Sequence, residues 1–307
     1  MKGFPTAFFS SIMNLALVLL IAPLFDGMTR KVTAVVQSRK GPPITQSYMD
    51  LMKLLIKEDI EVGDSPVMQR FSALLSFSAI LSVALLIPMG ASAPLSGYAD
   101  SILLIYLLTL AGISILLAGL AAGSTYSLVG MSREMMAMMT LEPLLAIAII
   151  LSAIHVDSLK LDAVFGGAEY AGSHLFGSHI LILGVVAFAL QAFVGRMPFD
   201  VTEAETEIME GPLVEYSGPK LALFKYTRMA KMFLYTALFI GLFVPRIATG
   251  YYALDLVVFL AEQAVLVLIV TVIAATHARY RIDQVVRYYV ILFFFALLAL
   301  LLAVFEL

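Results

Sequence analysis

The residues in this sequence best suited to chemistry are carboxylates, and most are concentrated in one polar segment, 197–218. Five acids fall within eleven residues and a sixth follows: Asp200, Glu203, Glu205, Glu207, Glu210 and Glu215. Carboxylates this close repel one another, and burial would favour their protonated forms. Such groups can pass protons along a chain. Pro198-Phe199 before the run and Gly211–Val214 after it favour a folded, partly buried segment over the alternative, a solvated acidic loop.

Further acids fall where the chain is otherwise apolar. Glu134 and Glu142 lie eight residues apart, about 12 Å along a helix, and Pro143 frees a backbone carbonyl beside Glu142. Glu262 lies inside another apolar run. Charged side chains at membrane depth are costly and usually functional. We expect Glu134, Glu142 and the acidic segment to form a proton relay or a charge-sensing device. A static ion pair is the alternative for each acid alone, and for Glu262 the two interpretations are balanced.

Basic side chains that could compensate these acids lie close to them in the sequence. Arg133 precedes Glu134, and Lys225, Arg228 and Lys231 follow the acidic segment at intervals of three residues. Residues at this spacing form a stripe along one side of a helix. We expect Arg133, Arg228 and Lys231 to be the charge partners of the carboxylates.

The composition of the chain indicates in what kind of protein these residues lie. Of 307 residues, 61% are hydrophobic and 13% charged, and the mean hydropathy is +0.98. Soluble domains are roughly 45–50% apolar and about 25% charged, so lipid must cover part of this surface. The absence of Cys excludes disulfides, thiolate nucleophiles and any Fe–S cluster held by this chain. A net charge of −3 argues against nucleic acid as a partner.

Eight apolar runs are suited to cross a bilayer as helices, which takes about 20 residues each. They lie at 7–26, 68–90, 101–122, 132–155, 178–195, 226–245, 254–277 and 287–306. The alternation of a transmembrane β-barrel is missing, and we find neither a linker nor an internal repeat. The chain is therefore predicted to be one all-α integral membrane domain over residues 1–307. The first run lacks a small-residue cleavage site, so we expect an uncleaved span rather than a signal peptide.

The basic residues set the expected orientation, because cytoplasmic loops of membrane proteins are enriched in Lys and Arg. All but Lys2, Lys160 and Arg246 of the 19 basic residues lie in or near the segments after the first, third, fifth and seventh spans. Those segments should face the cytoplasm, and both termini should face outside. We expect a multi-pass protein of the cell membrane.

The first cytoplasmic segment contains Arg39-Lys-Gly41-Pro42 and then a predicted short helix at 44–59. Four residues of that helix share one stripe and three charged residues lie elsewhere: Ile44, Tyr48, Leu51 and Leu55 against Asp50, Lys53 and Lys57. Such an amphipathic helix lies on the membrane surface or against a partner. A plain interfacial anchor is as good an interpretation as a functional surface.

The acidic segment also carries a helix signal. Thr202-x-x-Glu205 fits a capping box, which predicts a helix that starts near this point. On such a helix Glu203, Glu207 and Glu210 would share one face, and Glu205 would point away from it. This arrangement would gather three carboxylates on one side.

The usual catalytic motifs are missing. The sequence has no P-loop, no Gly-rich dinucleotide fingerprint, no HExxH and no CxxC, and its four His are scattered. We therefore expect neither stand-alone catalysis nor a metal site on this chain.

Several of these motifs resemble one family. The run PFDxxEAExE from Pro198, followed by EYSG from Glu215, resembles the signature loop of the membrane subunit 1 family of respiratory complex I. RxGP from Arg39 resembles that family's first cytoplasmic loop, and GxxRE from Gly130, ahead of Glu142, resembles its fourth span. The resemblance covers essentially the whole chain, and eight spans with an outward N-terminus agree with it.

Within the family, the sequence is closer to some members than to others. Quinone-reducing members carry an acid where Thr29 stands and an Asn-containing stretch where this chain has Pro43-Ile-Thr-Gln46, which weighs against a quinone site. The run from Glu207 to Gly218 resembles instead the counterpart in membrane-bound, energy-converting nickel–iron hydrogenases and in related sulfur-reducing complexes.

The resemblance implies a role for this chain in a multi-subunit complex. The chain would anchor a peripheral arm, made of a small Fe–S subunit and a hydrogenase-like large subunit, that carries the Fe–S clusters and the nickel–iron site. Antiporter-like and small membrane subunits would adjoin it. Electrons would pass from ferredoxin to that arm. The acids would couple this electron transfer to movement of H⁺ or Na⁺ across the membrane. Carried over by position, the coupling acids are Glu134, Glu142, Glu203, Glu205, Glu207, Glu210 and Glu215, with Glu262 matched less well. The rim of the arm-binding cavity corresponds to Arg39, Gly41, Pro42, Tyr48, Lys53 and Lys57.

Other functions stay open. The chain could be the quinone-binding subunit 1 of an NADH:quinone oxidoreductase, or the equivalent subunit of a membrane-bound sulfur reductase. A stand-alone secondary transporter is a third possibility, but it would require inverted repeats with matching broken helices, which we do not find.

Overall fold

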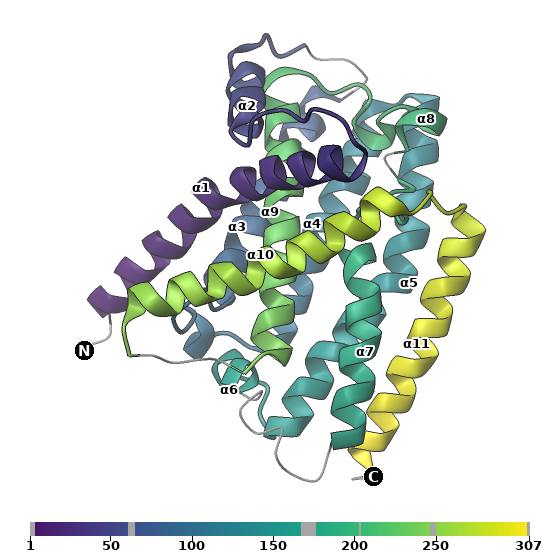
Figure 1. Ribbon diagram of the computed structural model, residues 1–307. Coiled ribbons are helices and arrows are strands. Elements are labelled where there is room, and N and C mark those ends of the chain that lie inside the picture. The colour runs from purple at the N-terminus through teal and green to yellow at the C-terminus, as the bar shows by residue number, and fades with distance from the viewer. Residues whose placement is uncertain (1–3, 61–64, 167–175, 203, 246–249, 306–307) are drawn as a thin grey trace.

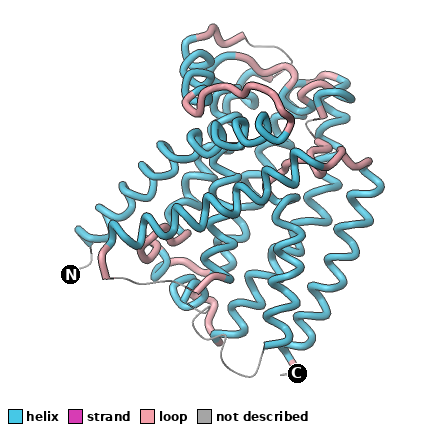
Figure 2. The backbone as a smooth tube through the Cα atoms, viewed as in Figure 1, coloured by secondary structure: helices cyan, strands magenta, loops and turns pink. Residues whose placement is uncertain are grey.

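The computed structural model describes residues 4–60, 65–166, 176–202, 204–245 and 250–305. Over these residues the chain consists of helices and connecting loops, without a strand (Figures 1 and 2). The predicted all-α class is thereby confirmed.

Each of the eight apolar runs coincides with a long helix. The helices are α1 (Phe4–Val36), α3 (Pro66–Leu86), α4 (Ser101–Ala122), α5 (Thr125–Val156), α7 (Phe176–Phe193), α9 (Gly218–Phe243), α10 (Tyr252–Thr276) and α11 (Ile282–Val304). Pro23 and Pro143 lie inside α1 and α5, which continue through them. Packing against neighbouring helices compensates the backbone bond that each proline removes.

Six of the described helices are long and apolar enough to cross a membrane: α1 over Ser10–Val36, α3, α4, α5, α10 and α11. α7 provides a shorter apolar stretch, Gly177–Phe193. α9 is long enough, at 26 residues, but four basic residues lie between its start and its middle: Lys220, Lys225, Arg228 and Lys231. These basic residues lie toward the start of α9, and the acidic segment directly precedes that helix.

α9 forms the centre of the helix assembly, and α1, α2, α3, α7 and α10 pack against it. Its buried Phe233 contacts the rings of Phe25 and Phe259, with centroids 5.6 Å and 6.3 Å away. α1 and α10 lie side by side and run obliquely across α9 (Figure 1). α11 packs against α5 and α7. The central helix therefore fixes the positions of the elements that hold polar side chains.

The short elements mark the two ends of the assembly. α2 (Gln46–Ile56) and α8 (Glu205–Ile208) lie at one end, and α6 (Leu161–Gly166) lies at the other (Figure 1). Two 3-10 turns, η1 (Ser96–Tyr98) and η3 (Gly211–Leu213), complete the order. The first and third polar segments thus share one end, as the distribution of basic residues requires.

The structure shows how the predicted amphipathic helix lies on the protein. α2 is shorter than 44–59, and it turns Ser47, Leu51 and Leu54 toward the protein. Leu55 and Ile44, which were expected on the stripe, are 51% and 43% exposed. The reason is that α2 begins only at Gln46 and a polar contact, Ser47 with α1, sets its rotation.

The predicted capping box is also wrong. α8 has only four residues, and its N-cap is Ala204, without a side-chain hydrogen bond. Glu210 lies beyond the helix, so it cannot share a helical face with Glu207. Glu203 and the side chain of Glu205 lie outside the part of the chain that is described. The segment is mostly loop because Pro212 and the left-handed Gly211, with φ +56°, interrupt any longer helix.

Candidate functional site

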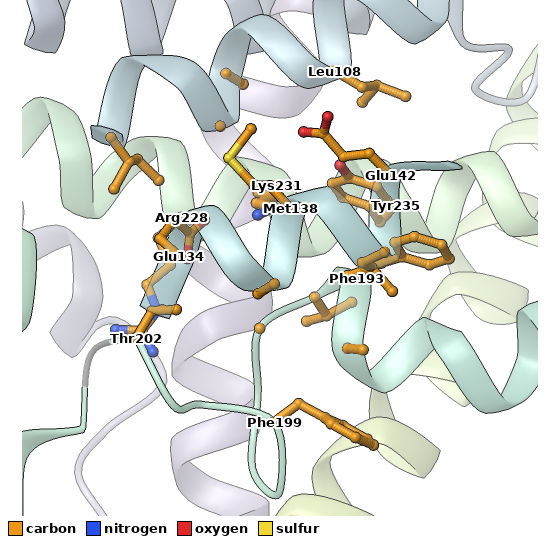
Figure 3. Close-up of a pocket in the computed structure, with 18 of the residues that line it drawn as sticks. Leu108, Glu134, Met138, Glu142, Phe193, Phe199, Thr202, Arg228, Lys231 and Tyr235 are labelled. Carbon is orange, nitrogen blue, oxygen red and sulfur yellow. The ribbon is translucent and has the colours of Figure 1, made fainter. Parts of the chain in front are cut away.

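A cavity of about 100 Å³ lies between α4, α5, α9 and the polar segment before α9. We call it the acid cavity, because three of the predicted acids line it: Glu134, Glu142 and Asp200. Figure 3 shows Glu134 and Glu142 in this cavity. Lys231 and Tyr235 of α9 line the same space. The sequence alone placed these acids in segments far apart, and the fold brings them to one cavity.

The geometry of α5 places Glu134 and Glu142 at two levels of this cavity. They are eight residues apart, which corresponds to about 12 Å along the helix axis. Glu142 lies against Gly112 of α4: a Cβ atom on Gly112 would be 3.4 Å from Glu142 Oε1. Lys231 Nζ stands 5.7 Å from the ring centroid of Tyr235. A cavity that holds carboxylates, an ammonium and a phenol can hold water and relay protons.

Asp200 closes the acid cavity at the end that carries α8. Its Oδ1 is 3.6 Å from Arg228 Nη2 and its Oδ2 is 3.5 Å from Arg279 Nη2. The Asp200 side chain is 17% exposed. The expected pairing of the basic residues of α9 with the preceding acids is therefore realised at Arg228, and Arg279 joins from the α10–α11 connection.

The other described acids of the segment lie at the rim. Glu207 Oε2 accepts a hydrogen bond of 2.7 Å from Arg133 Nη1, which also donates to the Val201 carbonyl at 3.3 Å. Glu210 lies 3.8 Å from Lys225. The side chains of Glu207 and Glu210 are 47% and 46% exposed. They belong to a segment that is partly buried, as expected, since Val201, Ala204 and Ile208 are buried.

Close backbone packing holds the segment against α5. A Cβ atom on Gly130 would lie 2.6 Å from Pro212 Cδ and 2.8 Å from Gly211 Cα. The Ser127 hydroxyl donates to the Gly119 carbonyl at 2.9 Å and to the Pro212 carbonyl at 3.3 Å. The glycine of the GxxRE motif thus has a packing role: it lets η3 approach the helix that carries Glu134.

A second cavity, of about 280 Å³, lies between α1, α9, α10 and the segment that follows α7. We call it the basic cavity, because four arginines line it: Arg30, Arg39, Arg196 and Arg228. Asp200 and Arg228 line both cavities. Pro42, which was predicted to belong to a docking rim, is part of its wall.

The sequence analysis missed the ion-pair network beside the basic cavity. Asp26, whose side chain is only 6% exposed, contacts Arg196 Nη2 at 2.7 Å and Arg30 Nε at 3.0 Å. The Ser47 hydroxyl donates to Asp26 Oδ2 at 2.9 Å, and Arg30 also contacts Asp50 at 2.8 Å. A signal was present: Asp26 is the last residue of the first predicted span, and an acid at such a position is expensive unless paired.

The predicted docking residues lie at the end of the molecule that carries α2. A Cβ atom on Gly41 would lie 2.7 Å from the Ala34 Cβ, so this loop packs closely against α1. Tyr48 donates a hydrogen bond to the Leu20 carbonyl. Lys53 and Lys57 are exposed. Arg39 and Pro42 line the basic cavity. We refer to these two residues, together with Gly41, Tyr48, Lys53 and Lys57, as the predicted docking surface.

Two acids lie away from the acid cavity. Glu262 of α10 lines a third cavity, of about 40 Å³, together with Asp255, Phe165 and Gly241. Glu215 is partly exposed and lines none of the three cavities. Among the described residues, no group of three or more His, Asp or Glu side chains is arranged to hold a metal ion.

Comparisons with known proteins agree on one family. The family described as NADH dehydrogenase matches residues 9–305. Hydrogenase-4 component C of Escherichia coli is 34% identical over 75% of this chain and 73% of its own length. Formate hydrogenlyase subunit 4 of the same organism is 31% identical over 86% of this chain and 88% of its own.

Respiratory and structural relatives extend the comparison. NADH-ubiquinone oxidoreductase chain 1 of Varanus baritji is 31% identical over 88% of this chain and 85% of its own length. A solved structure of the membrane-bound sulfane sulfur reductase, an archaeal respiratory membrane complex, contains a chain with a TM-score of 0.88 and 26% identity. That match covers 97% of this chain and 99% of the other. The likeness therefore extends over almost the whole fold.

Proposed function

This chain belongs to the NADH dehydrogenase family, which comprises membrane subunits of complex I-like assemblies. We propose that it is the membrane anchor and the coupling subunit of a hydrogenase-type complex. In this role it docks a peripheral arm and links ferredoxin-driven electron transfer in that arm to movement of H⁺ or Na⁺. The observation that carries the proposal is the acid cavity, which Glu134, Glu142 and Asp200 line together.

The coupling step follows from the chemistry of that cavity. A carboxylate in a confined, partly apolar space takes up or releases a proton when a neighbouring charge changes. A change of charge or position at the arm would reach Asp200 first, because this residue closes the cavity toward α8. Glu134 and Glu142 then continue the path into the membrane. Glu207 and Glu210, paired with Arg133 and Lys225, position the segment.

The proposed topology completes this picture. All eight long helices cross the membrane, including the shorter α7 and the basic α9, in the cell membrane. The end with α2 and α8 faces the cytoplasm, and both termini face outside. The large excess of Lys and Arg near the α2 end supports this orientation.

The proposed partners hold the redox centres. A small Fe–S subunit and a hydrogenase-like large subunit form the arm, and they carry the Fe–S clusters and the nickel–iron site. Antiporter-like and small membrane subunits adjoin this chain in the bilayer. Support comes from the lack of Cys in this chain and from the names of its relatives, hydrogenase-4 component C and formate hydrogenlyase subunit 4.

The test replaces Glu142 by Gln in the intact complex, reconstituted in liposomes. We expect electron transfer from reduced ferredoxin to continue while ion uptake falls at least about tenfold, since one protonatable group of the path is lost. Glu207→Gln should weaken coupling with the complex still assembled. Glu58→Gln, an exposed acid that lines no cavity, is the matched control. Normal ion uptake in both Glu142→Gln and Glu207→Gln would refute the relay and leave an anchor.

A quinone-binding subunit is the second candidate, supported by the 31% identity to NADH-ubiquinone oxidoreductase chain 1. It predicts that the purified complex retains quinone and oxidises NADH. The arginine-rich lining of the basic cavity is a less suitable wall for a neutral quinone. A sulfur reductase of the same plan would instead reduce sulfur substrates at the arm, with this chain in the same role.

A further inference from the structure

The basic cavity combines arginines from three separate segments of the chain. Arg30 comes from α1, Arg39 from the loop after it, and Arg196 from the connection after α7. Because these segments are far apart in sequence, their convergence on one space of about 280 Å³ is a product of the fold. Arginine is the side chain best suited to hold phosphate or carboxylate, since its planar group donates several hydrogen bonds at once.

The carboxylates beside these three arginines do not balance them. Asp26 is shared by Arg30 and Arg196, and Asp50 contacts Arg30 only. Arg39 has Gln37 as its side-chain partner, at 2.9 Å from Nε, and forms no ion pair within the described residues. Three guanidinium groups therefore face two carboxylates, which leaves an excess of one positive charge before Asp200 and Arg228 are considered. An anion in the cavity would compensate this charge.

Part of the lining of the basic cavity is apolar. Met232 of α9 and Val270 and Ala274 of α10 line it, together with Met197. α1 and α10 lie side by side there (Figure 1), and both present apolar side chains outward, such as Leu24 (42% exposed) and Ile269 (48% exposed). A ligand with a charged head and an apolar body fits such a space better than a small hydrophilic ion.

We propose that the basic cavity binds the phosphate group of an anionic membrane lipid. The phosphodiester accepts hydrogen bonds from Arg39 and from the remaining donors of Arg30 and Arg196, and the glycerol and first acyl carbons lie against Met232 and Val270. Basic pockets between transmembrane helices on the cytoplasmic side are suited to anionic headgroups. The bound lipid joins the loop that carries Arg39 to α1 and α10, beneath the docking surface.

The test measures lipid binding to the purified, delipidated complex. Phosphatidylglycerol or phosphatidylcholine is titrated in detergent at about 0.3 M salt, where surface charges are largely screened, and bound lipid per complex is counted by mass spectrometry. We expect a preference for phosphatidylglycerol, because the choline cation would meet the guanidinium groups. Inorganic phosphate at millimolar concentration should displace little of it, since the ion lacks the apolar contacts.

Matched variants locate the site. Arg39→Gln should weaken phosphatidylglycerol binding about fivefold, as expected for one basic contact, and Arg39→Lys should restore most of it. Lys40→Gln removes the neighbouring charge, which does not line the cavity, and should leave the preference unchanged. Ala274→Phe fills the apolar wall and should also lower binding while every charge is kept.

Several results would overturn the proposal. Equal binding of the two lipids, or an equal loss in Lys40→Gln and Arg39→Gln, would show only general attraction to basic surface. Full displacement by inorganic phosphate would assign the site to the free ion. Co-purification of a quinone that Arg39→Gln releases would assign it to a quinone. None of these results bears on ion uptake by Glu142→Gln, so the two proposals fail separately.

Discussion

Asp200 and Arg228 form part of the wall between the two larger cavities, and both residues line both spaces. Their closest atoms, Oδ1 and Nη2, are 3.6 Å apart, and Arg279 holds the other carboxylate oxygen at 3.5 Å. At these distances the contacts are long for charge-assisted hydrogen bonds. The pair can therefore rearrange without a large loss of energy, and a rearrangement would alter both cavities together.

Replacing Asp200 by Asn tests this connection. The neutral amide leaves the guanidinium groups of Arg228 and Arg279 without their shared carboxylate, so we expect ion uptake in liposomes to fall several-fold while ferredoxin oxidation continues. Asp283→Asn, at an exposed position in the first turn of α11, should change neither quantity. Unimpaired uptake in Asp200→Asn would remove this residue from the coupling path.

Asp26 is predicted to be critical for stability. Asp26→Ala removes a buried carboxylate and its ion pair with Arg196, while Arg30 keeps its contact with Asp50. Breaking a buried ion pair by removing one partner typically costs about 3–5 kcal/mol. Asp50→Ala removes a carboxylate whose side chain is 38% exposed, and exposed pairs contribute only about 0–1 kcal/mol. Thermal inactivation of the purified complex should show a large decrease for Asp26→Ala and a small one for Asp50→Ala. Similar decreases would contradict the assigned burial.

Gly130 is predicted to be intolerant of any side chain. In Gly130→Ala the new methyl group would overlap Pro212 and Gly211, and overpacking of this kind costs about 1–3 kcal/mol. Limited proteolysis should cut the segment around residues 200–215 faster in this variant. Gly184→Ala in α7 adds a methyl group with no neighbour within 4 Å, so its digestion pattern should match that of the unaltered protein.

The attachment of α2 should depend on pH in the acidic range. Burial alone would raise the pKa of Asp50, but hydrogen bonds from Gln46 at 2.9 Å and Arg30 at 2.8 Å hold it below its ordinary value of 3.8. A lowered folded-state pKa means that the contact stabilises fully above pH 3.8 and is lost as pH falls through the lower value. A spin label on a cysteine introduced at the exposed Met52 should become more mobile as the pH falls through this range. Asp50→Asn should abolish this pH dependence.

The sequence predicted the helices well and the contacts between them only in part. Apolar runs identify membrane helices because lipid enforces both their length and their composition, and each predicted run coincides with a described helix. The pairing of Arg228 with Asp200 could be expected, since both lie close to the start of α9. The partnership of Asp26 with Arg196 could not, because their positions are 170 residues apart.

The polar segments were harder to predict because their conformation depends on tertiary packing. Thr202 and Glu205 have the spacing of a capping box, yet close packing of η3 on Gly130 limits the helix to four residues. The face of α2 that turns toward the protein likewise depends on a tertiary contact, since the Ser47 hydroxyl donates a hydrogen bond to Asp26. Neither the packing on Gly130 nor the bond from Ser47 to Asp26 can be inferred from the residue pattern of the segment alone.

The bond between Asp26 and Arg196 has a consequence for biogenesis. Asp26 emerges from the ribosome 170 residues before its partner Arg196. Tyr226, which donates a hydrogen bond of 3.0 Å to the Val18 carbonyl, follows later still. The first helix therefore enters the translocon region or the lipid with Arg30 of the same helix as the ion-pair partner of Asp26. Its contacts with Arg196 and Tyr226 form only after those residues have been made.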